Sequence, residues 1–382
     1  MIKILNIIGA RPQIIKAAAI SRAIRNHYSS QIEEIILHTG QHYDEKMSEV
    51  FFGEMGIPKP KYNLNVGSAS HGVQTAEMIK GIEKVINDEK PNVVLVYGDT
   101  NSTLAAAVAA AKLHYPVAHV EAGLRSYNKS MPEEINRITC DHASTLLFSP
   151  TQNGMKNLQK EGFDLSSEKP YHIDHPGVFH CGDVMYDNSL YFLKIADKKS
   201  RIIEENGLEK GNYILSTIHR DNNTDNPERL KQIFEAIYSI SKDYKLGFFI
   251  PLHPRTSNIL QKNLGDNLYQ RIIKRDLLKI SSPVSFFDMI RLESNARLIM
   301  TDSGGVQKEA YFFKKPCLIL RTETEWVEIV EQGTALICDA DTQKIIKGWK
   351  AFYNKSPVGF PPLFGDGQAS EFICQKLIET FA

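Results

Sequence analysis

The chain lacks several features that would assign it at once to a common protein class. Its 382 residues carry 45 lysines and arginines against 45 aspartates and glutamates, so neither sign of charge is in excess. Such a balance gives no global attraction to nucleic acid or to an anionic membrane surface. The longest run of small apolar residues, 104–111, is far too short to cross a bilayer. We therefore expect no nucleic-acid partner and no membrane partner, and any polyanionic ligand must be held by local groups.

Cysteine is also scarce, because the chain has only five and none forms a Cys-x-x-Cys pair. This spacing argues against both a zinc site and a disulfide framework. The first predicted strand is followed by Arg11 rather than by the cleavage site of a signal peptide. We therefore expect a soluble, cytoplasmic protein that holds no metal.

Short apolar segments alternate with helical patterns along almost the whole chain, which is the rhythm of βαβ units in a parallel sheet. At 382 residues the chain exceeds the size of one ordinary core, and a turn-rich stretch at 168–176 is the best boundary. We predict two doubly wound Rossmann-like α/β domains, 1–172 and 173–358, and a segment 359–382 whose helix (369–381) packs back onto the first domain. The predicted strands are 3–8, 34–38, 93–98, 117–120, 146–149, 178–181, 213–217, 246–250, 284–286, 298–301, 317–320 and 335–338.

Acidic and basic residues gather just after the predicted strand 117–120. Parallel α/β sheets bind their ligands at the carboxyl ends of the strands, and Pro132 suits the first turn of a helix that follows. We therefore predict that this segment forms part of a reaction centre. Its charged residues are Glu121, Arg125, Glu133, Glu134 and Arg137.

Three other predicted strands end in polar residues. Arg11 and Lys16 follow the first strand, where a phosphate fits the start of a helix, although both could be surface cations. Asp99 follows the strand 93–98, where it could instead cap a helix. His219 follows the strand 213–217, and a lone histidine is often structural.

The segment 301–309 combines an apolar strand, a turn of small residues and the start of a helix. Gly304 and Gly305 let backbone amides approach a diphosphate, and Glu309 could accept both ribose hydroxyls of a nucleotide. Neither a G-x-G-x-x-G pattern nor a P-loop follows the first strand, so NAD and ATP have no support there.

Taken together, these segments resemble the non-hydrolysing UDP-N-acetylglucosamine 2-epimerases, and the match runs nearly end to end. The resemblance implies a two-domain fold of the GT-B glycosyltransferase type with the active site in the interdomain cleft. It also implies a homodimer without cofactor or metal, which interconverts UDP-GlcNAc and UDP-ManNAc for cell-surface polysaccharide precursors. The matching motifs are Gly9-Ala-Arg-Pro12, His38-Thr-Gly-Gln-His42, Gly98-Asp-Thr-Asn101, His119-Val-Glu-Ala-Gly-Leu-Arg125, Pro132-Glu-Glu-Ile-Asn-Arg137, Thr301-Asp-Ser-Gly-Gly305 and Gly365-Asp-Gly367.

The resemblance further implies a route in which a proton leaves C2, UDP leaves C1, and UDP adds back to a glycal protonated on the opposite face. The catalytic positions carried over are Asp99, Glu121, Glu133 and His219. Either Asp99 or Glu121 would remove the C2 proton, while His219 and Arg11 would stabilise the departing diphosphate. The positions implied to bind substrate are Arg11, Lys16, Gln41, Arg137, His253, Ser303, Gly304, Gly305, Glu309 and Arg321.

Some segments depart from the pattern of the UDP-GlcNAc enzymes. The link 126–131 is shorter, and 41–46 lacks residues expected of enzymes activated by a second UDP-GlcNAc. The segments 182–187 and 321–328 look like the branch acting on UDP-2,3-diacetamido-2,3-dideoxyglucuronate, whose extra carboxylate would want a cation. Lys129, Arg125 or Arg321 could supply it, although each could equally be a surface or phosphate-binding residue.

Two further alternatives stand beside the epimerase interpretation. A glycosyltransferase of the same architecture would explain the nucleotide site, but it would leave the crowd of acids unexplained. A non-catalytic nucleotide-sugar sensor is the alternative of another class, and the set Asp99, Glu121, Glu133 and His219 argues against it.

Overall fold

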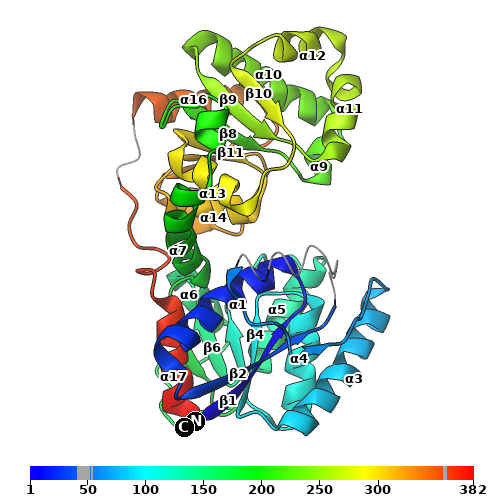
Figure 1. Cartoon of the computed structure of the whole chain (residues 1–382), viewed down its shortest axis with the longest axis vertical. Helices are drawn as coiled ribbons and strands as arrows, with labels where there is room; N and C mark the ends of the chain where they lie inside the picture. Colours follow the sequence, from blue (N-terminus) through cyan, green and yellow to red (C-terminus); the bar gives the residue numbers. More distant parts are fainter. Residues whose placement is uncertain (41–51, 53–54, 356–358) are drawn as a thin grey trace. The chain divides into compact units, whose positions relative to one another are not determined.

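The computed structural model describes residues 1–40, 52, 55–355 and 359–382. It divides into two compact units. The first contains Met1–Asn188 together with Pro362–Ala382, and the second contains Ser189–Pro361 (Figure 1). No helix of the described residues combines the length and the apolar character that crossing a membrane requires.

The first unit is built on a seven-stranded sheet in the order β3-β2-β1-β4-β5-β6-β7. Every pairing in it is parallel, and the order reverses between β1 and β4. All the strands predicted in this half are present, with ends that shift by two residues at most, whereas the short β3 was not predicted. The strands are β1 (Ile2–Ile8), β2 (Ile32–His38), β3 (Tyr62–Asn63), β4 (Val93–Tyr97), β5 (Val117–Val120), β6 (Leu146–Ser149) and β7 (Gly177–His180).

Helices of the first unit follow the sheet's buried strands. Helix α4 lies against both α3 and α5, and its buried alanines allow this close packing. Helix α17 packs against α1, and the Asp187 carboxylate accepts hydrogen bonds from the N–H groups of Ala369 and Ser370 at its start. The helices are α1 (Arg11–Ala23), η1 (Ile24–Tyr28), α3 (His71–Glu89), α4 (Asn101–Lys112), α5 (Pro132–His142), α6 (Gln152–Lys160) and α17 (Ala369–Phe381); α7 (Val184–Lys199) runs from this unit into the second.

The second unit is built on a six-stranded parallel sheet in the order β10-β9-β8-β11-β12-β13, which reverses between β8 and β11. The strand predicted at 284–286 is wrong: Ser285 caps α13, and the edge strand lies earlier, at β10. A short apolar run after a serine is typical of either a strand or the start of a helix. Here Ser285 caps a helix, so the run belongs to α13. The strands are β8 (Tyr213–Thr217), β9 (Gly247–Pro251), β10 (Leu278–Ser281), β11 (Leu298–Thr301), β12 (Cys317–Ile319) and β13 (Ala335–Ile337).

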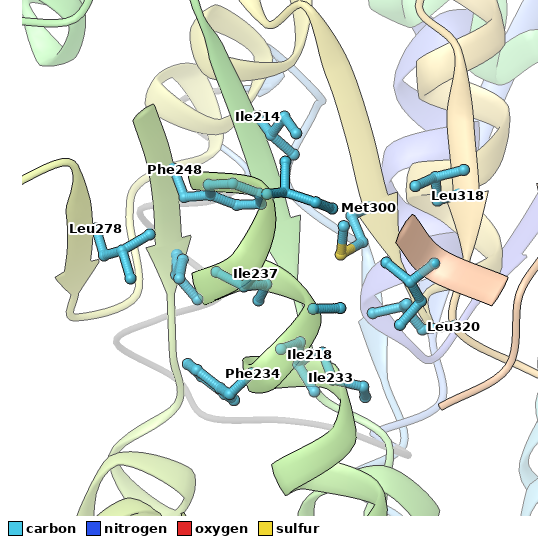
Figure 2. Close-up of a cluster of buried hydrophobic side chains, with 14 of the residues drawn as sticks. Ile214, Ile218, Ile233, Phe234, Ile237, Phe248, Leu278, Met300, Leu318 and Leu320 are labelled. Atoms are coloured by element: carbon cyan, nitrogen blue, oxygen red, sulfur yellow. The ribbon is translucent and has the colours of Figure 1, made fainter. Parts of the chain in front are cut away.

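One buried apolar cluster holds this second sheet to α10 (Figure 2). Ile233, Phe234 and Ile237 on α10 face Ile214 and Phe248 of the central strands, and all five are fully buried. Each such side chain contributes about 1.5–3 kcal/mol to folding. The helices of this unit are α8 (Ile202–Glu205), α9 (Asp221–Thr224), α10 (Pro227–Tyr244), α11 (Pro254–Leu264), α12 (Asp266–Ile273), α13 (Phe286–Asn295), α14 (Gly304–Phe312), α15 (Val327–Glu331) and α16 (Thr342–Asn354).

The predicted fold class, two doubly wound α/β sheets, is thus confirmed. Open parallel sheets bind ligands outside the carboxyl ends of their strands, at the point where the strand order reverses. This rule points to the ends of β1, β4 and β5 in the first unit and to the ends of β8 and β11 in the second.

Candidate active site

Two ion pairs lie at the reversal point of the first sheet. Lys16 on α1 pairs with Glu121, which follows β5, and Arg137 on α5 pairs with Asp99, which follows β4. The side chain of Glu121 is 11% exposed and that of Asp99 is 31% exposed, so solvent or a ligand can reach both carboxylates. The structure therefore brings together four of the residues predicted from sequence.

The two adjacent glutamates at the start of α5 differ in their surroundings. Glu134 is almost fully buried, bonds Arg137 at 2.9 Å, and accepts the N–H groups of Ser126 and Tyr127 at 2.9 and 2.8 Å. Burial alone would raise the pKa of Glu134, but these backbone bonds and Arg137 hold it below its ordinary value. Glu133, the residue predicted to be catalytic, is exposed. The sequence could not tell which of the two would hold the loop and which would face solvent.

The environment of Asp99 raises its basicity above that of an ordinary aspartate. Burial raises the pKa of Asp99, and the negative charges of Glu121 and Glu133 raise it further, against the opposing effect of Arg137 and Lys16. A raised pKa brings a carboxyl closer to the pH at which general acid–base catalysis is most efficient. Asn136 fixes the backbone here by donating to the Asp99 carbonyl at 2.8 Å.

Replacing Arg137 by glutamine is expected to move the acid limb of the pH–activity profile to higher pH. Because the guanidinium lowers the pKa of Asp99, its loss raises that pKa further and leaves more of the base protonated at neutral pH. Losing a nearby positive charge raises the pKa of a carboxyl group, and the acid limb should move in the same direction. The measurement is kcat/KM against pH, with Lys112→Gln, an exposed cation at the end of α4, as control. An unmoved limb would contradict this role for Arg137.

Two left-handed backbone positions shape the floor of this site. Glu121 has φ of 76°, and its N–H and that of Ala122 both donate to the Phe148 carbonyl at 3.0 Å. Gly98 has φ of 61°, and a Cβ there would lie 3.0 Å from both Glu121 Oε2 and Lys16 Nζ. Such a backbone costs a non-glycine residue about 1–3 kcal/mol, and strain of this kind gathers at functional sites.

Gln13, which sequence reasoning missed, organises the loop after β1. Its side-chain oxygen accepts the N–H groups of Gly9 and Ala10 at 2.9 and 3.1 Å, and its amide nitrogen donates to the Tyr97 carbonyl at 3.1 Å. Gly9 does not have a positive φ; a Cβ there would overlap the hydroxyls of Thr39 and Ser102. With those two amides engaged by Gln13, a phosphate at this loop would depend on side chains, of which Arg11 is exposed.

In the second unit, the buried Asp302 links the ends of β8 and β11. Its carboxylate accepts the N–H of His219 at 3.0 and 3.1 Å, the N–H of Arg220 at 3.1 Å and the side-chain amide of Asn223 at 3.0 Å. Ser303 follows Asp302 directly in the chain. The hydrogen bonds of Asp302 therefore connect the turn that contains His219 to the glycine turn 303–305. Asp302 was not predicted; its only signal was its place between the strand and the two glycines.

The turn after β11 has the form expected of an anion-binding helix start. Ser303 caps α14 by accepting the N–H of Val306, and Gly304 and Gly305 open the helix. The N-terminus of such a helix favours a phosphate through its free amides and its dipole. Glu309 stands on the same helix and is partly exposed, as a ribose-binding role requires.

Arg321 lies beside this turn in a two-pronged ion pair with Glu325, with both N–O distances at 2.9 Å. Burial would raise the pKa of Glu325, but Arg321 lowers it below its ordinary value. A Cβ on Gly304 would stand 3.5 Å from Glu325 Oε2, so this pair borders the glycine turn. The charge of Arg321 is thus already balanced within the protein.

The predicted residue His253 follows β9 rather than a strand at either reversal point. His253 is the exposed N-cap of α11, and its ring nitrogen accepts the N–H of Arg255 at 3.3 Å. Gln41 lies outside the described residues. No group of three or more histidine, cysteine or acidic side chains in the described ranges is arranged to hold a metal ion.

Acids paired with cations on one doubly wound unit, and a glycine turn with a helix start on another, are features that a nucleotide-sugar enzyme requires. Residues 23–378 match the family model described as UDP-N-acetylglucosamine 2-epimerase. The chain belongs to this family, and the resemblance drawn from its motifs is confirmed. It is accordingly an isomerase.

Individual relatives match over nearly the whole chain. A UDP-N-acetylglucosamine 2-epimerase homolog of Methanococcus maripaludis is 48% identical over 98% of this chain and 99% of its own length. The UDP-2,3-diacetamido-2,3-dideoxy-D-glucuronate 2-epimerase of Pseudomonas aeruginosa is 45% identical over 98% of this chain and 99% of its own. The crystal structure of Methanocaldococcus jannaschii UDP-GlcNAc 2-epimerase with UDP-GlcNAc and UDP superposes with a TM-score of 0.81 at 42% identity, covering 99% of both chains.

Proposed function

We propose that this chain is a non-hydrolysing epimerase that interconverts UDP-GlcNAc and UDP-ManNAc. The observation that carries the proposal is the pair of carboxylates, Asp99 and Glu121, at the ends of adjacent strands, each held by its own cation. Inverting C2 of a sugar requires that a proton leave one face and another arrive on the opposite face. Two acids within one site supply both transfers.

The proposed chemistry keeps atoms and electrons balanced without a cofactor. A carboxylate takes the C2 proton, the C–H electron pair becomes the C1–C2 double bond, and the C1–O bond breaks with its electrons leaving on UDP. A carboxyl group then protonates the glycal at C2 from the other face, and the diphosphate oxygen of UDP re-forms the bond to C1. The turn 303–305 and Glu309 hold UDP, while His219 and Arg11 stabilise its diphosphate.

A second candidate substrate is the UDP-linked 2,3-diacetamido uronate, favoured by the identity to the Pseudomonas aeruginosa relative. Its extra carboxylate needs a cation, but Arg321 is paired with Glu325, and Arg125 is paired with Asp141 and Glu161. Lys129, on the exposed loop before α5, is the third candidate cation. Two of the three candidate cations are thus already paired with acids of the protein. This favours UDP-GlcNAc as the substrate, because its sugar carries no charge.

Parallel kinetics with the two nucleotide sugars test this choice of substrate. We expect a larger kcat/KM for UDP-GlcNAc, and we expect Lys129→Gln to leave it unchanged. A larger kcat/KM for the uronate, lost in Lys129→Gln, would overturn the assignment and identify the cation that reads the extra carboxylate. Lys112→Gln serves as the matched exposed control.

The setting of the reaction belongs to the same proposal. We place the enzyme in the cytoplasm, as a homodimer that supplies precursors of cell-surface polysaccharide. All five cysteines lie in described parts of the chain and are free thiols, which fits a reducing compartment. Size-exclusion chromatography with light scattering tests the dimer, and a monomer at working concentration would overturn it.

A further inference from the structure

A buried charged cluster is hydrogen-bonded to the turns that carry the two proposed acids, Asp99 and Glu121. His119 and Asp141 are fully buried, and the ring Nδ1 of His119 lies 2.7 Å from Asp141 Oδ1. Arg125 reaches the other carboxylate oxygen of Asp141 at 2.7 Å and binds Glu161 through two bonds of 2.7 Å. None of these four side chains is needed to contact a substrate, yet three of them sit in the protein interior.

The contacts of this cluster run to both catalytic turns. The second ring nitrogen of His119, Nε2, lies 2.8 Å from the carbonyl oxygen of Gly98, the residue before Asp99. Asp141 Oδ2 accepts the N–H of Gly123 at 3.1 Å, two residues beyond Glu121. One buried carboxylate is therefore connected to the turn of Asp99 through His119 and to the turn of Glu121 directly.

Both turns need such restraint. Gly98 and Glu121 have φ of 61° and 76°, in the left-handed region, and the backbone at Glu121 is strained for a residue with a side chain. The Gly98 N–H donates to the Val120 carbonyl at 3.0 Å, which ties the two turns to each other. Left unrestrained, a strained turn relaxes, and its carboxylate moves away from the position it must hold.

The hydrogen bonds themselves require His119 to be a cation. A backbone carbonyl can only accept, so Nε2 must carry a proton toward Gly98, and an ionised Asp141 can only accept, so Nδ1 must carry one as well. Burial would lower the pKa of His119, but the neighbouring Cys140 and Asp141 raise it well above its usual value. Burial likewise opposes ionisation of Asp141, whose pKa is nonetheless lowered by His119 and Arg125. The charged or titratable groups around the pair are Cys140, Arg125, Glu161 and, at 3.5 Å from Glu161, His142.

We propose that His119 and Asp141 form a buried positioning pair that holds the turns of Asp99 and Glu121 in the geometry needed for proton transfer at C2. The imidazolium of His119 connects Asp141 to the Gly98 carbonyl through one hydrogen bond to each. Arg125 supplies the second positive charge that keeps Asp141 ionised. Neither residue of the pair touches the substrate. The inference rests on the proposed function, because it assigns the pair a role in that reaction.

The test compares His119→Gln, Asp141→Asn and the double variant with His114→Gln, an exposed histidine just before β5, as control. Displacing a reacting group by about 1 Å costs on the order of 100-fold in rate, so we expect each single variant to lose about that much kcat. KM and the affinity for UDP should change little, because the nucleotide-binding turn lies on the other unit. Wild-type kcat in His119→Gln would overturn the proposal.

The pH dependence separates positioning by a charged pair from a general loss of structure. In Asp141→Asn the pKa of His119 falls, since its carboxylate partner is gone while burial and Arg125 remain. The imidazole of this variant therefore loses its proton at a lower pH than in the wild type. As pH falls and the imidazolium forms again, the ratio of wild-type kcat to variant kcat should fall toward one. In His119→Gln and in the double variant this ratio should stay constant with pH. A ratio for Asp141→Asn that is also constant would overturn the charged-pair account.

Two controls keep the outcomes distinct. If Asp141→Asn does not fold, as judged by circular dichroism, then His119→Gln and the double variant decide, because neither leaves an unbalanced charge on His119. Failure of the proposed function would appear as wild-type enzyme that puts no deuterium at C2 of UDP-GlcNAc in deuterated water. Failure of the positioning inference would appear as active wild type together with fully active His119→Gln.

Discussion

An Asp99→Asn enzyme is expected to lose nearly all exchange of the C2 proton with solvent, together with epimerisation. Asparagine keeps the shape of the side chain and its contact distance to Arg137, but it cannot accept a proton. A positioned general base contributes roughly 100- to 10,000-fold to a rate, and we expect a loss in that range for both activities. The measurement is the proton NMR signal at C2 of UDP-GlcNAc in deuterated water.

The control for this variant is Asp88→Asn, which changes an exposed carboxylate at the end of α3. This variant should exchange the C2 proton of UDP-GlcNAc with solvent at the wild-type rate. Full exchange in Asp99→Asn would remove Asp99 from the reaction and would leave Glu121 as the base.

Glu121→Gln is expected to have the second large effect, on rate and on stability together. Lys16 would lose its partner in a site where both side chains are only 11% exposed. Removing one member of a buried ion pair costs about 3–5 kcal/mol, most of it from the charge left unpaired. The loss of an acid–base group should also lower kcat by about 100-fold or more.

Adding Lys16→Met to Glu121→Gln separates these two effects. The double variant removes both charges, so we expect its thermal midpoint to recover toward that of the wild type while kcat stays low. A double variant that regains wild-type kcat would mean that Glu121 acts only by balancing Lys16. If Glu121→Gln alone has wild-type stability, the Lys16–Glu121 ion pair contributes little to the free energy of unfolding.

Much of the fold followed from short apolar runs, because a strand buried on both faces needs a nearly continuous apolar sequence. Val93–Tyr97 and Val117–Val120 are such runs, and the structure confirms them. Two elements at sheet edges were not recovered. The two-residue β3 is too short to leave a pattern. The edge strand β10 was missed because a strand was predicted instead at 284–286, where Ser285 caps α13.

The sequence could predict at which strand ends the site lies. Parallel α/β sheets bind ligands at the carboxyl ends of their strands, and applying this rule needs only the order of the elements along the chain. It placed Asp99 and Glu121 at the ends of two strands. The structure brings these strand ends to the reversal point and pairs the two acids with Arg137 and Lys16. The partners of each group could not be predicted. Which glutamate of α5 turns inward depends on the rotation of the helix, and Glu134 rather than Glu133 bonds Arg137.

The residues that sequence reasoning missed share one property: each acts through hydrogen bonds to backbone far away in the chain. Gln13 holds the carbonyl of Tyr97, Asp141 holds the N–H of Gly123, and Asp302 holds that of His219. Such contacts require the tertiary fold before they can be recognised. All the catalytic and substrate-binding roles assigned from the sequence, including those of His253 and Gln41, stay predictions.

Incubation of the wild-type enzyme with UDP-GlcNAc in deuterated water tests the central claim most directly. If proton removal at C2 and loss of UDP occur at this site, both UDP-GlcNAc and newly formed UDP-ManNAc should carry deuterium at C2 and at no other carbon-bound position. UDP should remain attached to the sugar at the end of the reaction, since the enzyme is non-hydrolysing. Formation of UDP-ManNAc without deuterium at C2, or no UDP-ManNAc at all, would contradict the account.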